Sequence, residues 1–262
     1  MPSTTPSKST TARVAKVPFL NSAPYFHGFA PGERWETSEG SPRVCAQQAA
    51  SGELTAALLP LVEYFRLEDR FERLGPFGIA VRGRAQSASL FSLKPIRQID
   101  GAVISVTEES STTACLLRLI MEQKLHVTPA KYVRGAPAEA QARLAIGDEA
   151  LQLAHANTRW PFEVDMGFEW WLWQHQPFVF AVWAVRRDAD STTKRELETA
   201  VTRSLGQNQK KFGEISQGAS ARLNIPAPKL EAYLRNFVYR LSAPEEEAIK
   251  MFRKLVDEHH LL

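Results

Sequence analysis

The chain has 262 residues, of which 44% are hydrophobic and 23% are charged. This composition is typical of a soluble globular protein and excludes disordered, collagen-like and low-complexity classes. The 32 basic and 29 acidic residues leave a net charge of +3 without a basic cluster, so no nucleic-acid partner is expected. The two cysteines, Cys45 and Cys115, show no metal-ligand spacing, which argues against a zinc site or disulfide scaffold and favours buried, reduced thiols.

The amino-terminal segment differs in composition from the rest of the chain. Residues 1–12 are rich in Ser, Thr and Pro and contain no apolar run, so we expect a short disordered arm and no secretory signal. Farther along, no stretch approaches the roughly 18 apolar residues that a membrane span requires. These features favour a cytoplasmic protein with no membrane partner.

From residue 13 onward, short apolar runs alternate with segments of helical periodicity. The runs that predict strands are residues 14–20, 55–59, 77–81, 88–93, 102–106, 130–133, 142–146 and 178–185. Between them, Ser41 and Pro42 should begin a helix that Gly52 ends, and another helix should begin near residues 110–113. Strands and helices that alternate in this way indicate an α/β protein with mainly parallel sheets.

After residue 187 the pattern becomes helical. The sequence predicts three helices with separate signals, namely a capping box of Thr193 and Glu196, an apolar stripe at positions 230, 234, 237 and 241, and a capping box of Ser242 and Glu245. No internal repeat and no Pro- or Gly-rich linker divides the chain. We therefore expect any second lobe to be joined by short crossings.

Two segments place polar residues between a strand and a helix. Asn21 and Ser22 follow the first predicted strand, where ligands bind in open α/β sheets, although the pattern alone favours Asn21 as a cap of the helix that begins near Pro24. Residues 110–113 supply four consecutive hydroxyls at another helix start, where free N–H groups favour a carboxylate or phosphate. Alternatively, the hydroxyls of this second segment only cap the helix that they begin.

Two further segments favour structural explanations. Gly147 and Asp148 follow the strand at 142–146, where a turn with a capping Asp accounts for them. Trp170, Trp171 and Trp173 could stack on an aromatic ligand, but core packing is the better explanation for most of this aromatic surface.

Several catalytic motifs are absent from the sequence. There is no GxGxxG, P-loop, HExxH, GxSxG or CxxC motif, and the histidines are scattered. We therefore expect no metal and no cofactor. What remains is a site built from Asn, Ser, Thr and backbone N–H groups.

Seven ordered blocks of the sequence resemble the chorismate dehydratase family of menaquinone biosynthesis. The blocks are VPFLNSAP, GELTAALLPLVEYF, QSASLFS, TEESSTTACLLRL, AIGDEAL, DMGFEWWLW and PFVFAVWAVR. The resemblance implies an α/β, two-lobed clamshell like that of type II periplasmic binding proteins, with a helical carboxyl terminus. It places residues 13–95 and 185–262 in one lobe and residues 96–184 in an inserted lobe.

The resemblance also implies a reaction and a set of site residues. The family removes water from chorismate to give 3-[(1-carboxyvinyl)oxy]benzoate, the first step of the futalosine route to menaquinone. Asn21 matches the family's residue at the reacting centre and is the expected catalytic residue. Ser87, Ser110, Thr112 and Thr113 match positions that hold the substrate.

Three other residues complete the expected substrate-binding set. These are Ser22, Gly147 and Asp148, which follow strand ends in the matching blocks. The chain departs from the family pattern at Gln174-His175-Gln176, where many members have Thr-Gly-Leu. No general base stands out, and one hypothesis is that a carboxylate of the substrate takes the proton.

Three alternative functions use the same fold. A non-catalytic solute receptor would need export, for which the amino terminus offers no signal. A ligand-sensing regulator usually carries a DNA-binding helix pair before such a domain, and too few residues precede the first strand. A sister enzyme acting on a later intermediate fits the PFVFAVW block less well.

Overall fold

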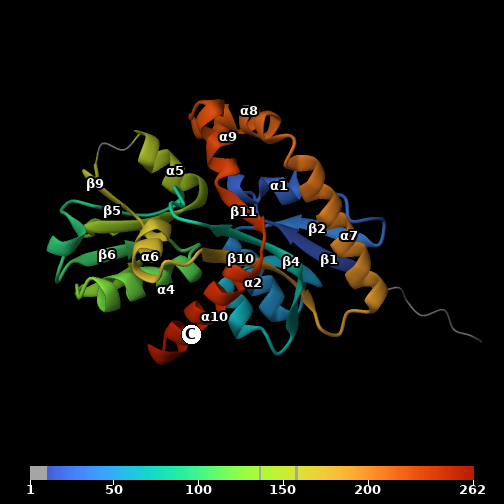
Figure 1. The fold of residues 1–262 in the computed structure, drawn as a ribbon, viewed down its shortest axis with the longest axis horizontal. Helices are drawn as coiled ribbons and strands as arrows, with labels where there is room; N and C mark the ends of the chain where they lie inside the picture. Colours follow the sequence, from blue (N-terminus) through green and yellow to red (C-terminus); the bar gives the residue numbers. More distant parts are fainter. Residues whose placement is uncertain (1–10, 136, 157–158) are drawn as a thin grey trace, which may run out of the picture.

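Two β-sheets form two lobes that lie side by side in the computed structural model, which describes residues 11–135, 137–156 and 159–262 (Figure 1). The first sheet has the order β11-β4-β10-β3-β1-β2, formed by β1 (Ala12–Lys16), β2 (Trp35–Glu39), β3 (Ala56–Pro60), β4 (Phe71–Val81), β10 (Phe178–Arg186) and β11 (Phe237–Arg240). The second has the order β7-β6-β8-β5-β9, formed by β5 (Ala88–Ser92), β6 (Val103–Val106), β7 (Lys131–Arg134), β8 (Ala142–Ile146) and β9 (Phe162–Asp165). The predicted two-lobed α/β architecture is confirmed.

Both sheets are mixed. In the first, β1 pairs in parallel with β2 and β3, and in the second β6 pairs in parallel with β7 and β8. The strands next to the crossings run the other way: β10 is antiparallel to β3 and β4, β11 to β4, and β5 to β8 and β9. Of the antiparallel strands, β5 and β10 are the two that begin directly after a crossing from the other lobe.

The chain crosses between the sheets twice, once between β4 and β5 and once between α6 (Met166–Gln174) and β10. The sheets therefore divide the chain differently from the predicted bounds of 13–95, 96–184 and 185–262. β5 belongs to the second sheet, where it pairs with β8 and β9, and all of β10 belongs to the first. An apolar run does not reveal which sheet it joins, so these bounds could not be found from the run itself. The predicted arm lies outside the described residues except for its last two positions, and β1 begins at Ala12.

Helices cover the faces of both sheets, and α7 to α10 follow β10 in the sequence (Figure 1). The remaining helices are α1 (Ala23–Phe26), α2 (Pro42–Ser51), α3 (Leu61–Arg66), α4 (Thr112–Arg118), α5 (Gly147–Ala156), α7 (Ser191–Asn208), α8 (Phe212–Leu223), α9 (Ala227–Arg235) and α10 (Ala243–Glu258). Three further turns are the 3-10 helices η1 (Leu20–Ser22) and η2 (Ile96–Gln98) and the π-helix η3 (Leu119–Lys124). α8 of the first lobe contacts α5 of the second, above the space between the sheets.

Local signals fixed the ends of several helices. The Ser41 hydroxyl accepts a hydrogen bond from the Val44 N–H, and Gly52 ends α2 with a left-handed φ of 83°. The capping box at the start of α10 is also confirmed. The predicted box at Thr193 is wrong, because the carboxylate of Asp190 caps α7 three residues earlier.

The predicted helical stripe from 230 to 241 is wrong in its second half. α9 ends at Arg235, and residues 237–240 form β11 at the edge of the first sheet. Pairing with β4 satisfies backbone groups along this edge, and this long-range contact outweighs the helical spacing of the apolar residues.

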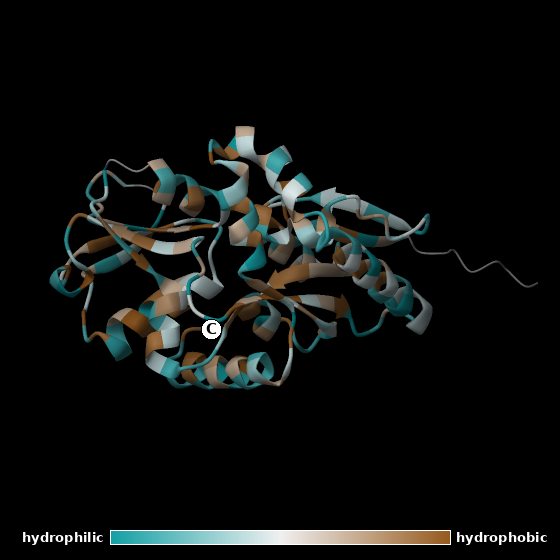
Figure 2. Cartoon of the chain, turned by 45° about the horizontal axis from the view of Figure 1, so that its top comes forward, coloured by the Kyte–Doolittle hydropathy of each residue, from teal (hydrophilic) through white to brown (hydrophobic). Residues whose placement is uncertain are grey.

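Hydrophobic residues concentrate on the strands and on the inner faces of the helices (Figure 2). Trp170 is fully buried and donates its indole N–H to the Pro177 carbonyl at 2.9 Å, as expected of a core residue, whereas Trp171 and Trp173 are only partly buried.

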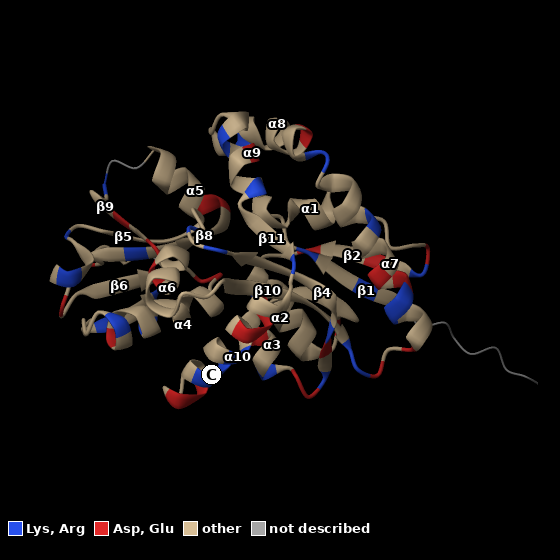
Figure 3. Cartoon of the chain, in the orientation of Figure 1, with Lys and Arg blue, Asp and Glu red and all other residues tan. Residues whose placement is uncertain are grey.

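Both cysteines are buried thiols, and burial raises the pKa of Cys45 to about 12. No helix in the described residues is both long and apolar enough to span a membrane. On the outer helices of the described residues, Lys and Arg lie interspersed with Asp and Glu (Figure 3).

Candidate functional site

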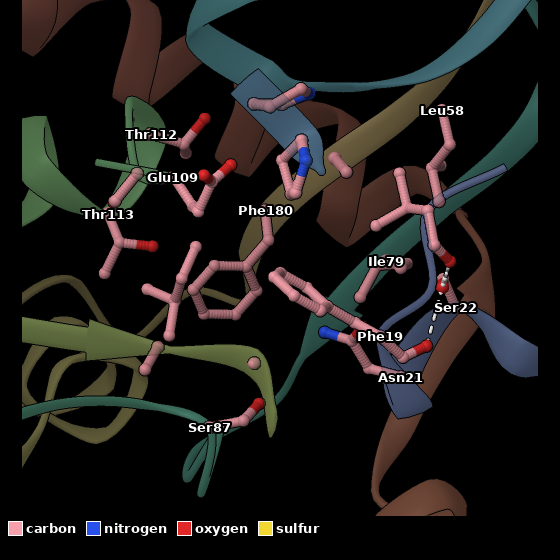
Figure 4. Close-up of a pocket in the computed structure, with 18 of the residues that line it drawn as sticks. Phe19, Asn21, Ser22, Leu58, Ile79, Ser87, Glu109, Thr112, Thr113 and Phe180 are labelled. Atoms are coloured by element: carbon pink, nitrogen blue, oxygen red, sulfur yellow. Dashed lines mark hydrogen bonds between the residues drawn. The ribbon is translucent and has the colours of Figure 1, made fainter. Parts of the chain in front are cut away.

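A cavity lies between the two sheets, where ends of strands from both lobes meet (Figure 4). It contains about 630 Å³ of empty space, counting the part open to solvent. The polar residues that line it are Asn21, Ser22, Ser87, Glu109, Ser110, Ser111, Thr112 and Thr113. Gly147 also lines it, so every predicted site residue except Asp148 is brought to this cavity.

Asn21 lies in the 3-10 turn η1, directly after β1, and points toward the cavity (Figure 4). Within the described residues its side chain makes no hydrogen bond, so it does not cap α1. The N-cap position of α1 is Ser22 instead, and that residue makes no side-chain cap either. The amide of Asn21 is therefore free to donate to one ligand oxygen and accept from another.

Two of the three serines in the predicted set, Ser22 and Ser87, use their hydroxyls within the protein. The Ser22 hydroxyl is 1% exposed and lies within hydrogen-bonding distance of the carbonyls of Val17, at 2.6 Å, and Phe19, at 2.7 Å. The Ser87 hydroxyl accepts a hydrogen bond from the Tyr233 hydroxyl at 2.8 Å. Burial raises the pKa of Tyr233 well above its ordinary value, so this phenol remains a donor. Both serines hold the walls of the cavity in place.

The hydroxyls at the start of α4 divide into two groups. Ser110 accepts from the Ala114 N–H at 3.1 Å, and Thr112 accepts from the Val62 N–H in the first lobe at 3.0 Å. Thr113 makes no hydrogen bond within the described residues, and its hydroxyl points into the cavity (Figure 4). The Ser111 hydroxyl oxygen is buried without a partner in the same part of the chain. Thr113 and Ser111 are thus the hydroxyls available to a ligand.

Gly147 and Asp148 begin α5 but have different surroundings. Gly147 faces the Phe19 ring, and a Cβ at this position would lie 2.7 Å from a ring carbon. Asp148 lies outside the cavity lining, where it accepts hydrogen bonds from the Leu20 N–H and from Arg222. The expectation that Asp148 contacts substrate therefore does not fit this structure, because its carboxylate is already occupied by groups of the first lobe.

Glu109, which the sequence did not single out, is the one ionisable side chain among the described residues that line the cavity. Its Oε1 lies 4.0 Å from the Nε of Arg43, and its Oε2 is buried without a hydrogen-bond partner in the described part of the chain. Glu109 also lines a neighbouring cavity that contains Arg43, Arg66 and Arg134. Its position between a strand end and the hydroxyl run was the signal that could have found it.

Aromatic rings form the apolar part of the site. Phe19 and Phe180 lie beside the polar groups, and Phe237 completes this part of the lining (Figure 4). Gln174-His175-Gln176, the departure from the family pattern, ends α6 with His175 in the left-handed region and leads into β10. None of these three residues lines the cavity. Among the described residues, no group of three or more His, Cys, Asp or Glu side chains is arranged to hold a metal ion.

Two lobes around a cavity define the fold of the chain, which is like that of the periplasmic binding proteins. The chain superimposes on protein AF1704 of Archaeoglobus fulgidus with a TM-score of 0.82 at 18% identity, covering 98% of this chain and 100% of that one. It superimposes on the alkanesulfonate-binding protein SsuA of Xanthomonas axonopodis pv. citri, solved with MOPS, with a TM-score of 0.69 at 12% identity, covering 97% and 94%. At these identities the likeness shows the fold.

The sequence comparisons define the family. Residues 12–258 match the family described as menaquinone biosynthesis, and the chain belongs to that family. It is 29% identical over 252 residues to the chorismate dehydratase of Thermus thermophilus, which covers 89% of this chain and 91% of that protein. The resemblance found in the sequence is confirmed.

Proposed function

We propose that the chain removes water from chorismate to give 3-[(1-carboxyvinyl)oxy]benzoate, the first step of the futalosine route to menaquinone. Family membership and the Thermus relative support this function. The observation that carries it is a pair of polar groups, the Asn21 amide and the Thr113 hydroxyl, on opposite sides of a cavity walled by aromatic rings (Figure 4). Neither group has a hydrogen-bond partner among the described residues.

The groups in the cavity suit this substrate. Chorismate presents two carboxylates and a ring hydroxyl, for which the Asn21 amide and the hydroxyls of Thr113 and Ser111 supply donors. Phe19 and Phe180 can cover the faces of a six-membered ring. Loss of water makes that ring aromatic, which supplies the driving force. The protein therefore needs mainly to position the substrate and stabilise the charge that develops on its ring carboxylate.

The reaction needs one group to accept a proton. The proton leaves the ring carbon that carries the ether oxygen, the electron pair forms a ring double bond, and the neighbouring hydroxyl departs. The group that accepts the proton can return it to this hydroxyl, so that water is released without net proton change. We assign this role to the substrate's own enolpyruvyl carboxylate, since Glu109, the alternative on the protein, lies at the border with the neighbouring arginine-lined cavity.

Incubation of the purified protein with chorismate tests the proposal. Proton NMR should show the aromatic enol ether forming faster than in a sample without protein, and Asn21→Ala should slow its formation. If chorismate binds, measured by calorimetry, but no aromatic product forms, the chain is a receptor of the same fold. If chorismate does not bind, the substrate is wrong.

A further inference from the structure

Asp148 connects the second lobe to the turn that carries Asn21. Its Oδ1 accepts a hydrogen bond from the Leu20 N–H at 2.9 Å, and its Oδ2 accepts one from the Arg222 guanidinium at 2.6 Å. Leu20 and Arg222 belong to the first lobe, whereas Asp148 begins α5 in the second. We propose that Asp148 is a positioning residue that holds Asn21 in its working orientation only when the two lobes are in contact. This inference rests on the proposed function.

The local structure of η1 explains why an outside acceptor matters. η1 is a single 3-10 turn, and Phe19 at its N-cap makes no side-chain hydrogen bond. The Leu20 N–H would otherwise be a buried donor without a partner, and Asp148 supplies that partner from 128 positions away. The Phe19–Leu20 peptide, one residue before Asn21, is thus fixed from the second lobe, while the Ser22 hydroxyl fixes the following turn within the first.

The backbone beside Asp148 also contacts the turn that carries Asn21. Gly147 has a φ of +60° and packs directly against the Phe19 ring, where a Cβ would overlap it. The Gly147 N–H donates to the Ser87 carbonyl at 2.8 Å, and Ser87 lies in the first crossing between the lobes. The start of α5 is therefore tied both to the crossing and to the turn that carries Asn21, so lobe closure and the position of Asn21 are coupled.

Arg222 offsets the charge of the Asp148 carboxylate. The Asp148 side chain is 12% exposed, so an unpaired carboxylate here would be costly and would repel an anionic substrate nearby. The Arg222 side chain is 55% exposed and reaches Asp148 from α8. Arg222 thus neutralises the Asp148 carboxylate, whereas the hydrogen bond from the Leu20 N–H to Asp148 positions the turn that carries Asn21.

Three variants separate positioning from stability. Asp148→Ala removes both contacts, whereas Asp148→Asn keeps an oxygen that can accept from Leu20. Glu169→Ala is the matched control, because the Glu169 carboxylate is about as buried as that of Asp148 and its ion pair with Lys124 lies within the second lobe. At a temperature where circular dichroism shows all of them folded, kcat with chorismate should fall by at least tenfold in Asp148→Ala, recover most of this loss in Asp148→Asn, and stay unchanged in Glu169→Ala.

A double variant tests whether Asp148 acts through Asn21. If it does, adding Asp148→Ala to Asn21→Ala should slow turnover by less than twofold beyond Asn21→Ala alone, because the positioned group is already gone. If the two losses multiply, Asp148 acts independently of Asn21 and the proposal is overturned. Should Asp148→Ala fail to fold, the same comparison is made with Asp148→Leu, which also removes the acceptor of the Leu20 N–H.

Hydrogen exchange of the Leu20 amide gives a readout that does not depend on activity. Asp148→Ala should speed this exchange by about tenfold or more, whereas Glu169→Ala should not change it. If the parent does not convert chorismate, the proposed function fails, and the exchange result still decides whether Asp148 holds the turn. Unchanged exchange at Leu20 in a folded Asp148→Ala variant overturns the inference, whatever the parent's activity.

Discussion

Replacement of Asn21 by Ala separates a ligand-binding role from a structural one. The Asn21 side chain is only partly buried, does not cap α1 and makes no hydrogen bond within the described residues. Its loss should therefore change the free energy of unfolding by no more than about 0.5 kcal/mol. If the amide orients the leaving hydroxyl or the reacting carboxylate, turnover should fall by about a hundredfold or more, which corresponds to roughly 2.7 kcal/mol in the barrier.

The neighbouring residue Ser22 provides the matched control. Its buried hydroxyl donates within the chain to the Val17 or Phe19 carbonyl, so Ser22→Ala should cost about 1–3 kcal/mol of stability. Thermal melts and initial rates with chorismate should be measured on both variants. We expect Asn21→Ala to melt like the parent and turn over slowly. An Asn21→Ala protein that melts early yet retains a near-parent rate would refute this reasoning.

The remaining predictions concern binding, proton transfer, metals and pH. Thr113→Val should weaken product binding in calorimetry by tenfold or more without lowering the melting temperature, whereas Thr112→Val should lower it, because only Thr112 bonds to the protein backbone. Glu109→Gln should keep turnover within tenfold of the parent, and a hundredfold loss would assign proton transfer to Glu109. Dialysis against a chelator should leave the rate unchanged, and a rate restored only by added metal would contradict this. Burial raises the pKa of Cys45 to about 12, so the unfolded chain loses this proton first and stability to urea should fall as the pH rises above about 8.5. Cys45→Ala should flatten that slope.

The sequence by itself determined the features that depend on neighbouring residues. Ser41 and Gly52 bound α2 because a hydroxyl cap and a left-handed glycine act within one turn of the helix. The apolar runs at β5 and β8 predicted strands because a short hydrophobic run is a local property of the sequence. The ordered family blocks predicted the architecture. The rule that ligands bind at strand ends predicted a site that includes Asn21 and Thr113, and both residues line the cavity.

Features that depend on distant partners could not be obtained in this way. The strand β2 has one buried and four exposed residues, so its sequence carries no strand periodicity, and it forms by pairing with β1. The apolar residues of β11 have helical spacing, but the segment forms a strand because it pairs with β4 at the edge of the first sheet. The sheet to which β5 belongs is likewise decided by its pairing with β8 and β9.

The same distinction applies within the site. The sequence placed Thr112, Thr113 and Asp148 in one set, since all three lie at the start of a helix that follows a strand. Only the tertiary structure separates them: Thr112 is bound to Val62, 50 positions away, and Asp148 to Leu20, 128 positions away, while Thr113 faces the cavity. A polar side chain near a strand end is available to a ligand only if no backbone group of the other lobe reaches it first, and that depends on how the two lobes meet.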